Sequence, residues 1–127
     1  MLFIRFIPAI AWFLVSLLLL TLPGSAVPKY PWLSLIYADK WVHITMFFIL
    51  GYFFSQPFVK TQLSQTQRKK GFLLILFSGI LYGISMEFVQ KYWIPFRSFE
   101  IGDIIADSFG CYLAYQYAIR KFLIDRM

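Results

Sequence analysis

The chain has 127 residues, of which 60% are hydrophobic and only 14% are charged, whereas soluble domains carry roughly 25% charged residues. This composition excludes an ordinary soluble domain, and its single cysteine, Cys111, excludes a disulfide framework. The formal net charge of +6 does not indicate a nucleic-acid-binding protein, because most Lys and Arg residues lie at the ends of apolar segments, where they set membrane orientation.

Four apolar segments are each long enough to cross a hydrocarbon core of about 30 Å as a helix that rises about 1.5 Å per residue. The loops between them are short, so we expect one all-α membrane domain over residues 1–127, a bundle of four transmembrane helices. In chain order the predicted spans are Phe3–Leu22, Trp41–Phe58, Phe72–Tyr92 and Ile104–Leu123.

The first segment resembles a secretory signal peptide, because it starts near Arg5 and is followed by small residues. Its long apolar run, with Pro8 and Trp12 inside, favours a retained helix instead. The loop that follows, 23–38, is rich in proline and in aromatic residues typical of a headgroup boundary; stacking on a sugar or lipid is the alternative.

The loop between the second and third segments, Val59–Gly71, contains the basic run Arg68-Lys69-Lys70. Such a run predicts a cytoplasmic loop, which places both termini in the cytoplasm and the acidic ends of the segments outside. The third segment contains Gly79 and Gly83 in a GxxxG pattern, which indicates close packing on a neighbouring helix of the same chain or, alternatively, dimerisation.

Ionisable residues gather at the outer ends of three segments, although a charged group at the bilayer centre costs about 2.5–3.5 kcal/mol. They fall into pairs three or four residues apart, and such pairs lie on one face of a helix. We therefore expect the pairs to meet in one outer site. The pairs are Asp39 and His43, Glu87 and the uncharged but polar Gln90, and Asp103 and Asp107, with Lys40 beside the first pair and Arg97, Ser98 and the acidic Glu100 between the last two.

Three kinds of chemistry suit these residue types. His and carboxylates bind divalent metals, but the chain has no HExxH or comparable spacing, so we expect no metal and no cofactor. The remaining alternatives are acid/base chemistry on a lipid-linked substrate, with Arg97 binding a phosphate, and a proton-linked path or binding cavity without chemistry. The candidate catalytic residues are His43, Glu87 and Asp103, and the candidate ligand-binding residues are Asp39, Lys40, Gln90, Arg97, Ser98 and Asp107.

Two blocks of these residues resemble the signature of the VanZ-like family of small bacterial membrane proteins. The first is Asp39-Lys40-x2-His43-x3-Phe47-x2-Leu50, and the second joins Glu87-x2-Gln90 to Arg97-Ser98-x4-Asp103-x3-Asp107-x2-Gly110. One departure is Asp107, which stands where the family usually has Asn and adds a carboxyl group to the site.

The resemblance implies a multi-pass protein of the bacterial cytoplasmic membrane, surrounded by the lipid bilayer. The namesake of the family is linked to low-level resistance to the glycopeptide teicoplanin, which implies a role at the cell envelope and an amphiphilic, lipid-linked or glycopeptide-like ligand. The alternatives are an intramembrane acid/base enzyme and a small proton-linked carrier, which would need a homo-oligomer to enclose a path. We expect no nucleic-acid partner.

Overall fold

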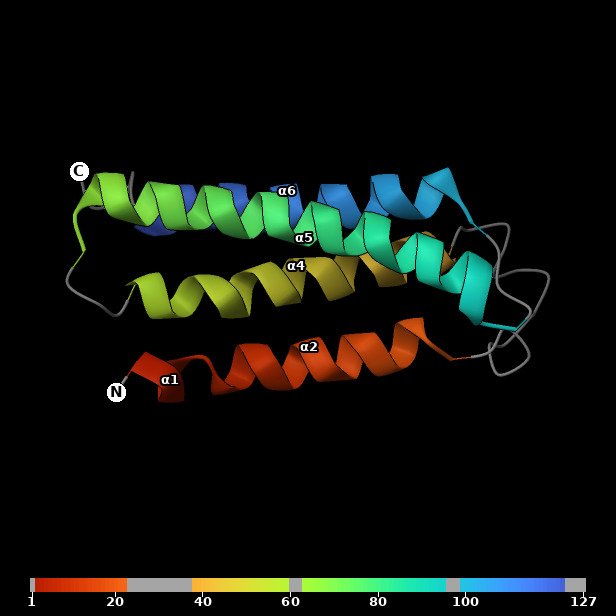
Figure 1. Cartoon of the computed structure of the whole chain (residues 1–127). Coiled ribbons are helices and arrows are strands. Elements are labelled where there is room, and N and C mark those ends of the chain that lie inside the picture. Colours follow the sequence, from red (N-terminus) through yellow and green to blue (C-terminus); the bar gives the residue numbers. More distant parts are fainter. Residues whose placement is uncertain (1, 23–37, 60–62, 96–98, 123–127) are drawn as a thin grey trace.

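The computed structural model describes residues 2–22, 38–59, 63–95 and 99–122. These residues contain no strand, and the long helices run alternately in opposite directions along one axis (Figure 1). The expected all-α fold is therefore confirmed. The helices are α1 (Leu2–Arg5), α2 (Ile7–Leu20), α4 (Ala38–Val59), α5 (Gln65–Trp93) and α6 (Ile101–Phe122).

The first predicted span is divided into two helices. α1 ends at Arg5 and α2 starts at Ile7, with Pro8 in the first turn of α2. Proline has a fixed φ and no N–H, so it fits the first turn of a helix and disfavours continuation of the turn before it. α2 itself has 14 residues, which at about 1.5 Å per residue is shorter than a hydrocarbon core.

α5 starts seven residues before the predicted span, inside the segment that the sequence predicted as a loop. The Ser64 hydroxyl accepts from the Gln67 N–H at 3.1 Å, and the Gln67 side chain accepts from the Ser64 N–H at 3.1 Å, which forms a capping box. Arg68 then donates from Nε to the carbonyl of Phe58 at 3.2 Å, at the end of α4. The basic run thus belongs to the first turns of α5.

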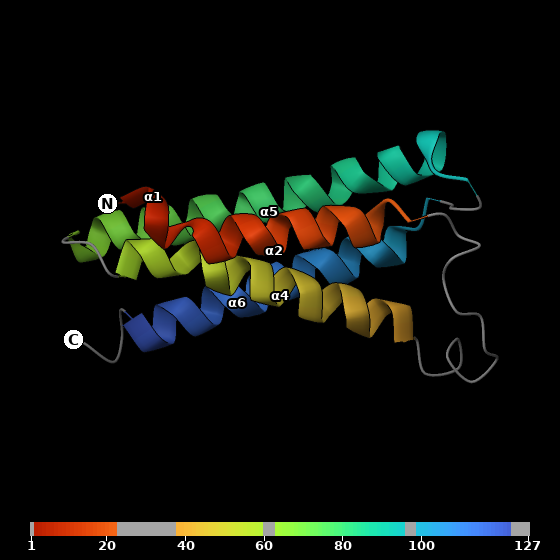
Figure 2. The ribbon, with the colours of Figure 1, turned by 90° about the horizontal axis from the view of Figure 1, so that it is seen from below.

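Close packing between α4, α5 and α6 depends on glycines. A Cβ atom on Gly51 of α4 would lie 2.7 Å from the Cβ of Ala114 of α6, and one on Gly79 of α5 would lie 2.6 Å from the Cys111 Sγ. These contacts let the backbones approach closely. In Figure 2, α4 lies across α6, with α2 alongside α4.

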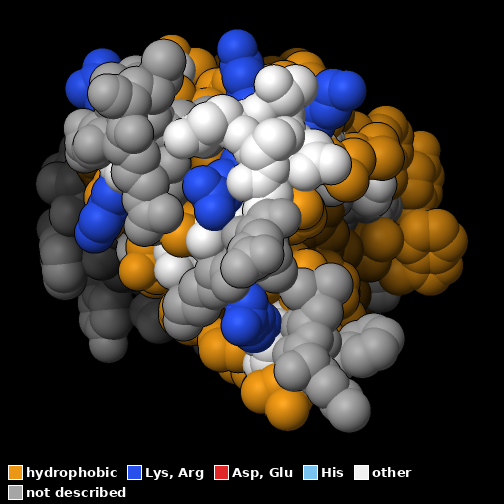
Figure 3. Space-filling view, turned by 90° about the vertical axis from the view of Figure 1, so that its left-hand side faces the viewer, with side chains coloured by type: hydrophobic (Ala, Val, Ile, Leu, Met, Phe, Trp, Pro, Cys, Tyr) orange, Lys and Arg blue, Asp and Glu red, His pale blue; other side chains and the backbone are white. Residues whose placement is uncertain are grey.

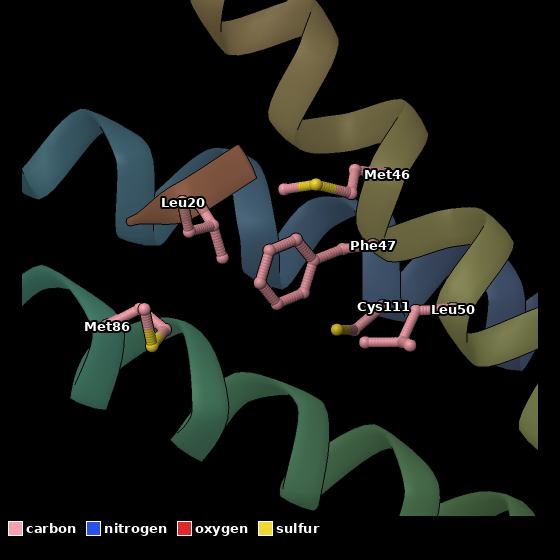
Figure 4. Packing of buried hydrophobic residues seen from close by; sticks show 6 residues of the cluster. All are labelled: Leu20, Met46, Phe47, Leu50, Met86 and Cys111. Atoms are coloured by element: carbon pink, nitrogen blue, oxygen red, sulfur yellow. The ribbon is translucent and has the colours of Figure 1, made fainter. Parts of the chain in front are cut away.

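The centre of the bundle is apolar. Leu20 of α2, Phe47 of α4, Met86 of α5 and Cys111 of α6 are all at most 5% exposed and point toward the same central volume (Figure 4). This cluster joins all four long helices.

Within the described residues, α4 and α5 are long and apolar enough to cross a membrane, and α2 is apolar but shorter. Large apolar side chains also face outward on α5, where Leu74, Phe77 and Leu81 are 64%, 63% and 64% exposed. A helix at a water-facing surface carries polar residues on that face. The membrane character expected from the sequence is therefore supported for two helices.

Candidate functional site

Three helix ends meet at the end of the bundle opposite the described start and end of the chain, on the right in Figure 1. They are the N-terminal ends of α4 and α6 and the C-terminal end of α5. Asp39 lies in the first turn of α4, and Asp103 lies in the first turn of α6. Carboxylates are stabilised there by the partial positive charge of the helix N-terminus.

Lys40 is the shared partner of three carboxylates. Its Nζ lies 2.7 Å from Asp39, 2.6 Å from Glu100 and 2.7 Å from Asp103. An ammonium group has three N–H donors, so these contacts occupy all of them. Lys40 therefore joins α4 to the start of α6 and offers no further donor to a ligand.

His43 lies one turn further along α4 and contacts two carboxylates of α6. Its Nδ1 is 2.6 Å from Asp107 Oδ1, and its Nε2 is 3.8 Å from Asp103 Oδ2. All three side chains are at most 8% exposed. A carboxylate at Nδ1 fixes the orientation of the ring and directs Nε2 toward the acidic side of the site.

Glu87 of α5 is the most deeply buried of the described acidic residues, with 0% of its surface exposed. Its Oε1 accepts from the backbone N–H of Glu100 at 2.9 Å. Its Oε2 is buried and has no hydrogen-bond partner among the described residues. Asp103, His43 and Asp107 are close enough to act on it electrostatically.

Gln90 lies one turn after Glu87 and is 1% exposed. Its Nε2 donates to the backbone carbonyl of Leu20 at 2.8 Å. This bond satisfies a carbonyl at the C-terminal end of α2, where the helix leaves carbonyls without intrahelical partners. Its amide nitrogen thus ties α5 to α2.

The structure brings together most of the residues that the sequence selected. Arg97 and Ser98 lie outside the described residues, so the anion-binding role expected for Arg97 stays a prediction. Lys91, in the last turn of α5, lies 5.2 Å from the ring centroid of Tyr92 and 5.9 Å from that of Phe99. The residues that meet at the site are Asp39, Lys40, His43, Glu87, Asp103 and Asp107. Gln90 lies one turn from Glu87 on α5, and its side chain bonds to α2.

Two residues that are not among the candidate catalytic or ligand-binding residues also build the site. Glu100 contributes a carboxylate to Lys40 and its N–H to Glu87. Gly83 leaves room for Asp107, since a Cβ at this position would lie 2.8 Å from the Asp107 Oδ2. The GxxxG pattern predicted that Gly83 packs against a neighbouring helix. The structure adds that the group packed against it is the carboxylate of Asp107 on α6.

Asp39, Glu100 and Asp103 offer oxygen atoms within 4.8 Å of one another, which is a spacing suited to a metal ion. The Lys40 ammonium contacts all three of these residues and thus occupies the place of a cation. Asp39, Glu100 and Asp103 therefore already have a cationic partner within the chain.

The chain resembles an uncharacterised protein of the fission yeast Schizosaccharomyces pombe, with 34% identity over 105 residues. The match covers 83% of this chain and 59% of the yeast protein, so the chain spans less than two thirds of that relative. No family model matches the sequence. No solved structure matches it either. A eukaryotic relative gives no support to the bacterial location that the VanZ-like resemblance implies.

Proposed function

We propose that this chain is a VanZ-like, multi-pass membrane protein that binds an amphiphilic or lipid-linked molecule at the acidic end of its bundle. The proposal includes four spans, of which α4 and α5 have the required length and hydropathy. It names a membrane without assigning it to a bacterium, because the relative found is a yeast protein. Antibiotic resistance gains no support from the comparisons.

The observation that carries the proposal is the buried carboxyl group of Glu87. A buried acceptor without a partner costs about 1–3 kcal/mol, and more when it is charged. Its Oε2 lacks a partner among the described residues, yet the neighbouring carboxylates are paired with Lys40 and His43. Such an atom is an unused acceptor, and a ligand donor would reach it by displacing the side chains that bury it.

The donors and acceptors of the site favour one class of headgroup. Lys40 gives all its N–H groups to carboxylates, and His43 gives one ring nitrogen to Asp107. The described part of the site is therefore rich in acceptors and negative charge. A headgroup that donates hydrogen bonds, such as an amine or a hydroxyl group, complements this site better than a phosphate does.

A second candidate function is acid/base catalysis on a lipid-linked substrate, and the contact between His43 and Asp107 favours it. A carboxylate bound to Nδ1 stabilises the imidazolium that forms when Nε2 accepts a proton. The enzyme hypothesis predicts that membranes containing the protein convert a lipid into a product visible in lipid extracts, and that His43→Asn stops the conversion. Binding alone predicts no product.

The test of the proposed function uses the protein in phosphatidylcholine nanodiscs with spin-labelled dodecylamine and spin-labelled dodecyl phosphate as probes. We expect a saturable, immobilised electron paramagnetic resonance signal from the amine that the phosphate does not give. Glu87→Gln keeps the shape of the side chain and replaces one acceptor oxygen with an amide NH₂ group, so it should weaken amine binding by about tenfold or more.

Glu100→Gln is the matched control, because its carboxylate is 47% exposed and lies at the rim of the site. We expect it to change amine binding by less than about threefold, as is typical of an exposed ion pair. Equal loss in both variants, or equal binding of amine and phosphate, would contradict the proposed function.

A further inference from the structure

A cavity-forming region of the bundle lies in the half opposite the acidic site. A cavity of about 390 Å³ extends between the helices from the level of Phe47 and Tyr82 to that of Phe58 and Phe72. Its walls are almost entirely apolar, and its Ser55 hydroxyl is already bonded to the Gly51 carbonyl at 2.7 Å. A buried water needs two to four polar partners, so this cavity suits a hydrocarbon better than water.

The length of the cavity matches one leaflet of a bilayer. Its wall on α4 runs from Phe47 to Phe58, and its wall on α5 runs from Phe72 to Tyr82. At about 1.5 Å per residue these walls are about 15–17 Å long, and half of a hydrocarbon core of about 30 Å is about 15 Å. One extended acyl chain therefore fits between the end of the bundle and the membrane centre.

Aromatic rings line the end of the cavity that lies nearer the acidic site. The rings of Phe47 and Tyr82 have centroids 5.5 Å apart, and Phe13 lies 5.0 Å from Tyr82. The Tyr82 hydroxyl is fixed by Ser16 at 2.8 Å. None of the acidic-site residues lines the cavity, so a molecule in the cavity would be distinct from a ligand of the acidic site.

The side of the bundle between α2 and α5 gives a hydrocarbon access to the cavity. α2 packs mainly on α4, and its described contacts with α5 are made by Phe13, Ser16 and Leu20, from the middle of α2 to its end. Leu74 and Ser78 of α5 line the cavity and are exposed at the surface. A lipid chain in the bilayer therefore reaches the cavity sideways, without passing through water.

The end of the bundle beside the cavity is basic. Arg68 donates to the carbonyl of Phe58, a wall residue, and Lys69 and Lys70 follow it as exposed side chains. The described residues of this half include no Asp or Glu, and Figure 3 shows Lys and Arg side chains over this end. A negatively charged headgroup complements it, with a gain of about fivefold in binding for each lysine near the surface.

We infer that this cavity is a binding site for one acyl chain of an anionic phospholipid from the leaflet on the basic side of the membrane. The inference rests on the membrane-spanning part of the proposed function and goes beyond it, because the lipid binds away from the acidic site. The lipid fills space that the side chains leave empty and holds α2 to α5.

The test places the protein in phosphatidylcholine nanodiscs that contain a minor fraction of phosphatidylglycerol with a diazirine at the end of one acyl chain. After irradiation, we expect adducts on Leu50 and Ala114, which are 5% and 3% exposed and line the cavity. Labelling confined to the outward-facing Phe77 and Leu81 would overturn the inference. This comparison uses the unmodified chain, so it does not depend on the folding of a variant.

A matched pair of variants tests the cavity itself. Ile75→Trp fills the cavity from its α5 wall, whereas Leu73→Trp changes an equally half-buried residue of the same helix that does not line it. We expect the first variant to lose the adducts on Leu50 and Ala114 and the second to keep them. Equal labelling in the two variants would overturn the inference.

The same preparations separate this inference from the proposed function. Glu87→Gln should leave the adducts unchanged while it weakens amine binding, because Glu87 does not line the cavity. A protein that does not insert into nanodiscs at all would remove both proposals. A protein that inserts and binds the amine without cavity adducts would remove only the lipid site.

Discussion

At the scale of single residues, the acidic site is organised by Lys40. Its side chain is only 23% exposed, and it contacts one carboxylate that is 8% exposed, Asp103. Removing one partner of a buried ion pair leaves an uncompensated charge, which costs more than the pair itself contributes. The stability of this end of the bundle therefore depends on one ammonium group.

We predict that Lys40→Met lowers the free energy of unfolding by about 1–3 kcal/mol, because it leaves the buried Asp103 carboxylate without its cationic partner. Asp39 and Glu100 are about half exposed, so water screens their charges and their loss of Lys40 should add little. Thermal unfolding in detergent measures the change. Lys91→Met is the control, since Lys91 contacts only rings in the described structure and should cost about 0.5–1 kcal/mol at most.

A second substitution tests whether the unpaired charge of Asp103 causes the loss of stability in Lys40→Met. Asp103→Asn in the Lys40→Met background removes the uncompensated charge and should recover part of the lost stability. A double variant that is less stable than Lys40→Met alone would show that charge compensation is not what Lys40 provides.

At the scale of the helices, the site depends on the close approach of α4 and α6. A Cβ on Gly110 would collide with the carbonyl oxygen of Ile44 and lie 3.1 Å from the Cβ of Phe47. A backbone carbonyl inside a helix cannot move aside alone. Gly110 thus sets the distance at which His43 reaches Asp107.

We predict that Gly110→Ala lowers the free energy of unfolding by about 1–3 kcal/mol, because the extra methyl group forces α4 and α6 apart. It should also weaken binding of the amine probe. Gly102→Ala makes the same change near the start of α6, where the nearest atom is the Lys40 Cε at 2.9 Å. Because three carboxylates hold Lys40, we expect this substitution also to disturb the acidic site, but to cost less stability than Gly110→Ala, whose obstacle is backbone.

At the scale of the whole molecule, charge is separated along the bundle. The carboxylates of the described residues lie at one end, and the basic residues around Arg68 lie at the other. Basic loops stay on the cytoplasmic side of a membrane. This asymmetry predicts that the acidic site faces away from the cytoplasm.

We predict that Ser64→Cys, at the basic end, and Phe99→Cys, beside the acidic site, react with a membrane-impermeant maleimide from opposite sides of sealed vesicles. Native Cys111 is 4% exposed within the bundle and should stay unlabelled. Labelling of both positions from the same side would contradict the topology.

Local signals in the sequence predicted the apolar helical segments and the residues that share a face. Hydropathy predicted where the apolar segments lie, and spacing paired Asp39 with His43 and Asp103 with Asp107, because both signals are local along the chain. The early start of α5 was missed because the capping box of Ser64 and Gln67 lies in a polar stretch that hydropathy does not count as helix.

The way in which the helices turn toward one another could not be predicted from the sequence and is seen in the three-dimensional structure. It joined Lys40 to three carboxylates and His43 to Asp107, left one oxygen of Glu87 without a partner among the described residues, and opened a cavity at the far end. These features depend on the rotation and separation of helices. The glycine contacts between α4, α5 and α6 set these quantities, and no periodicity within one segment encodes them.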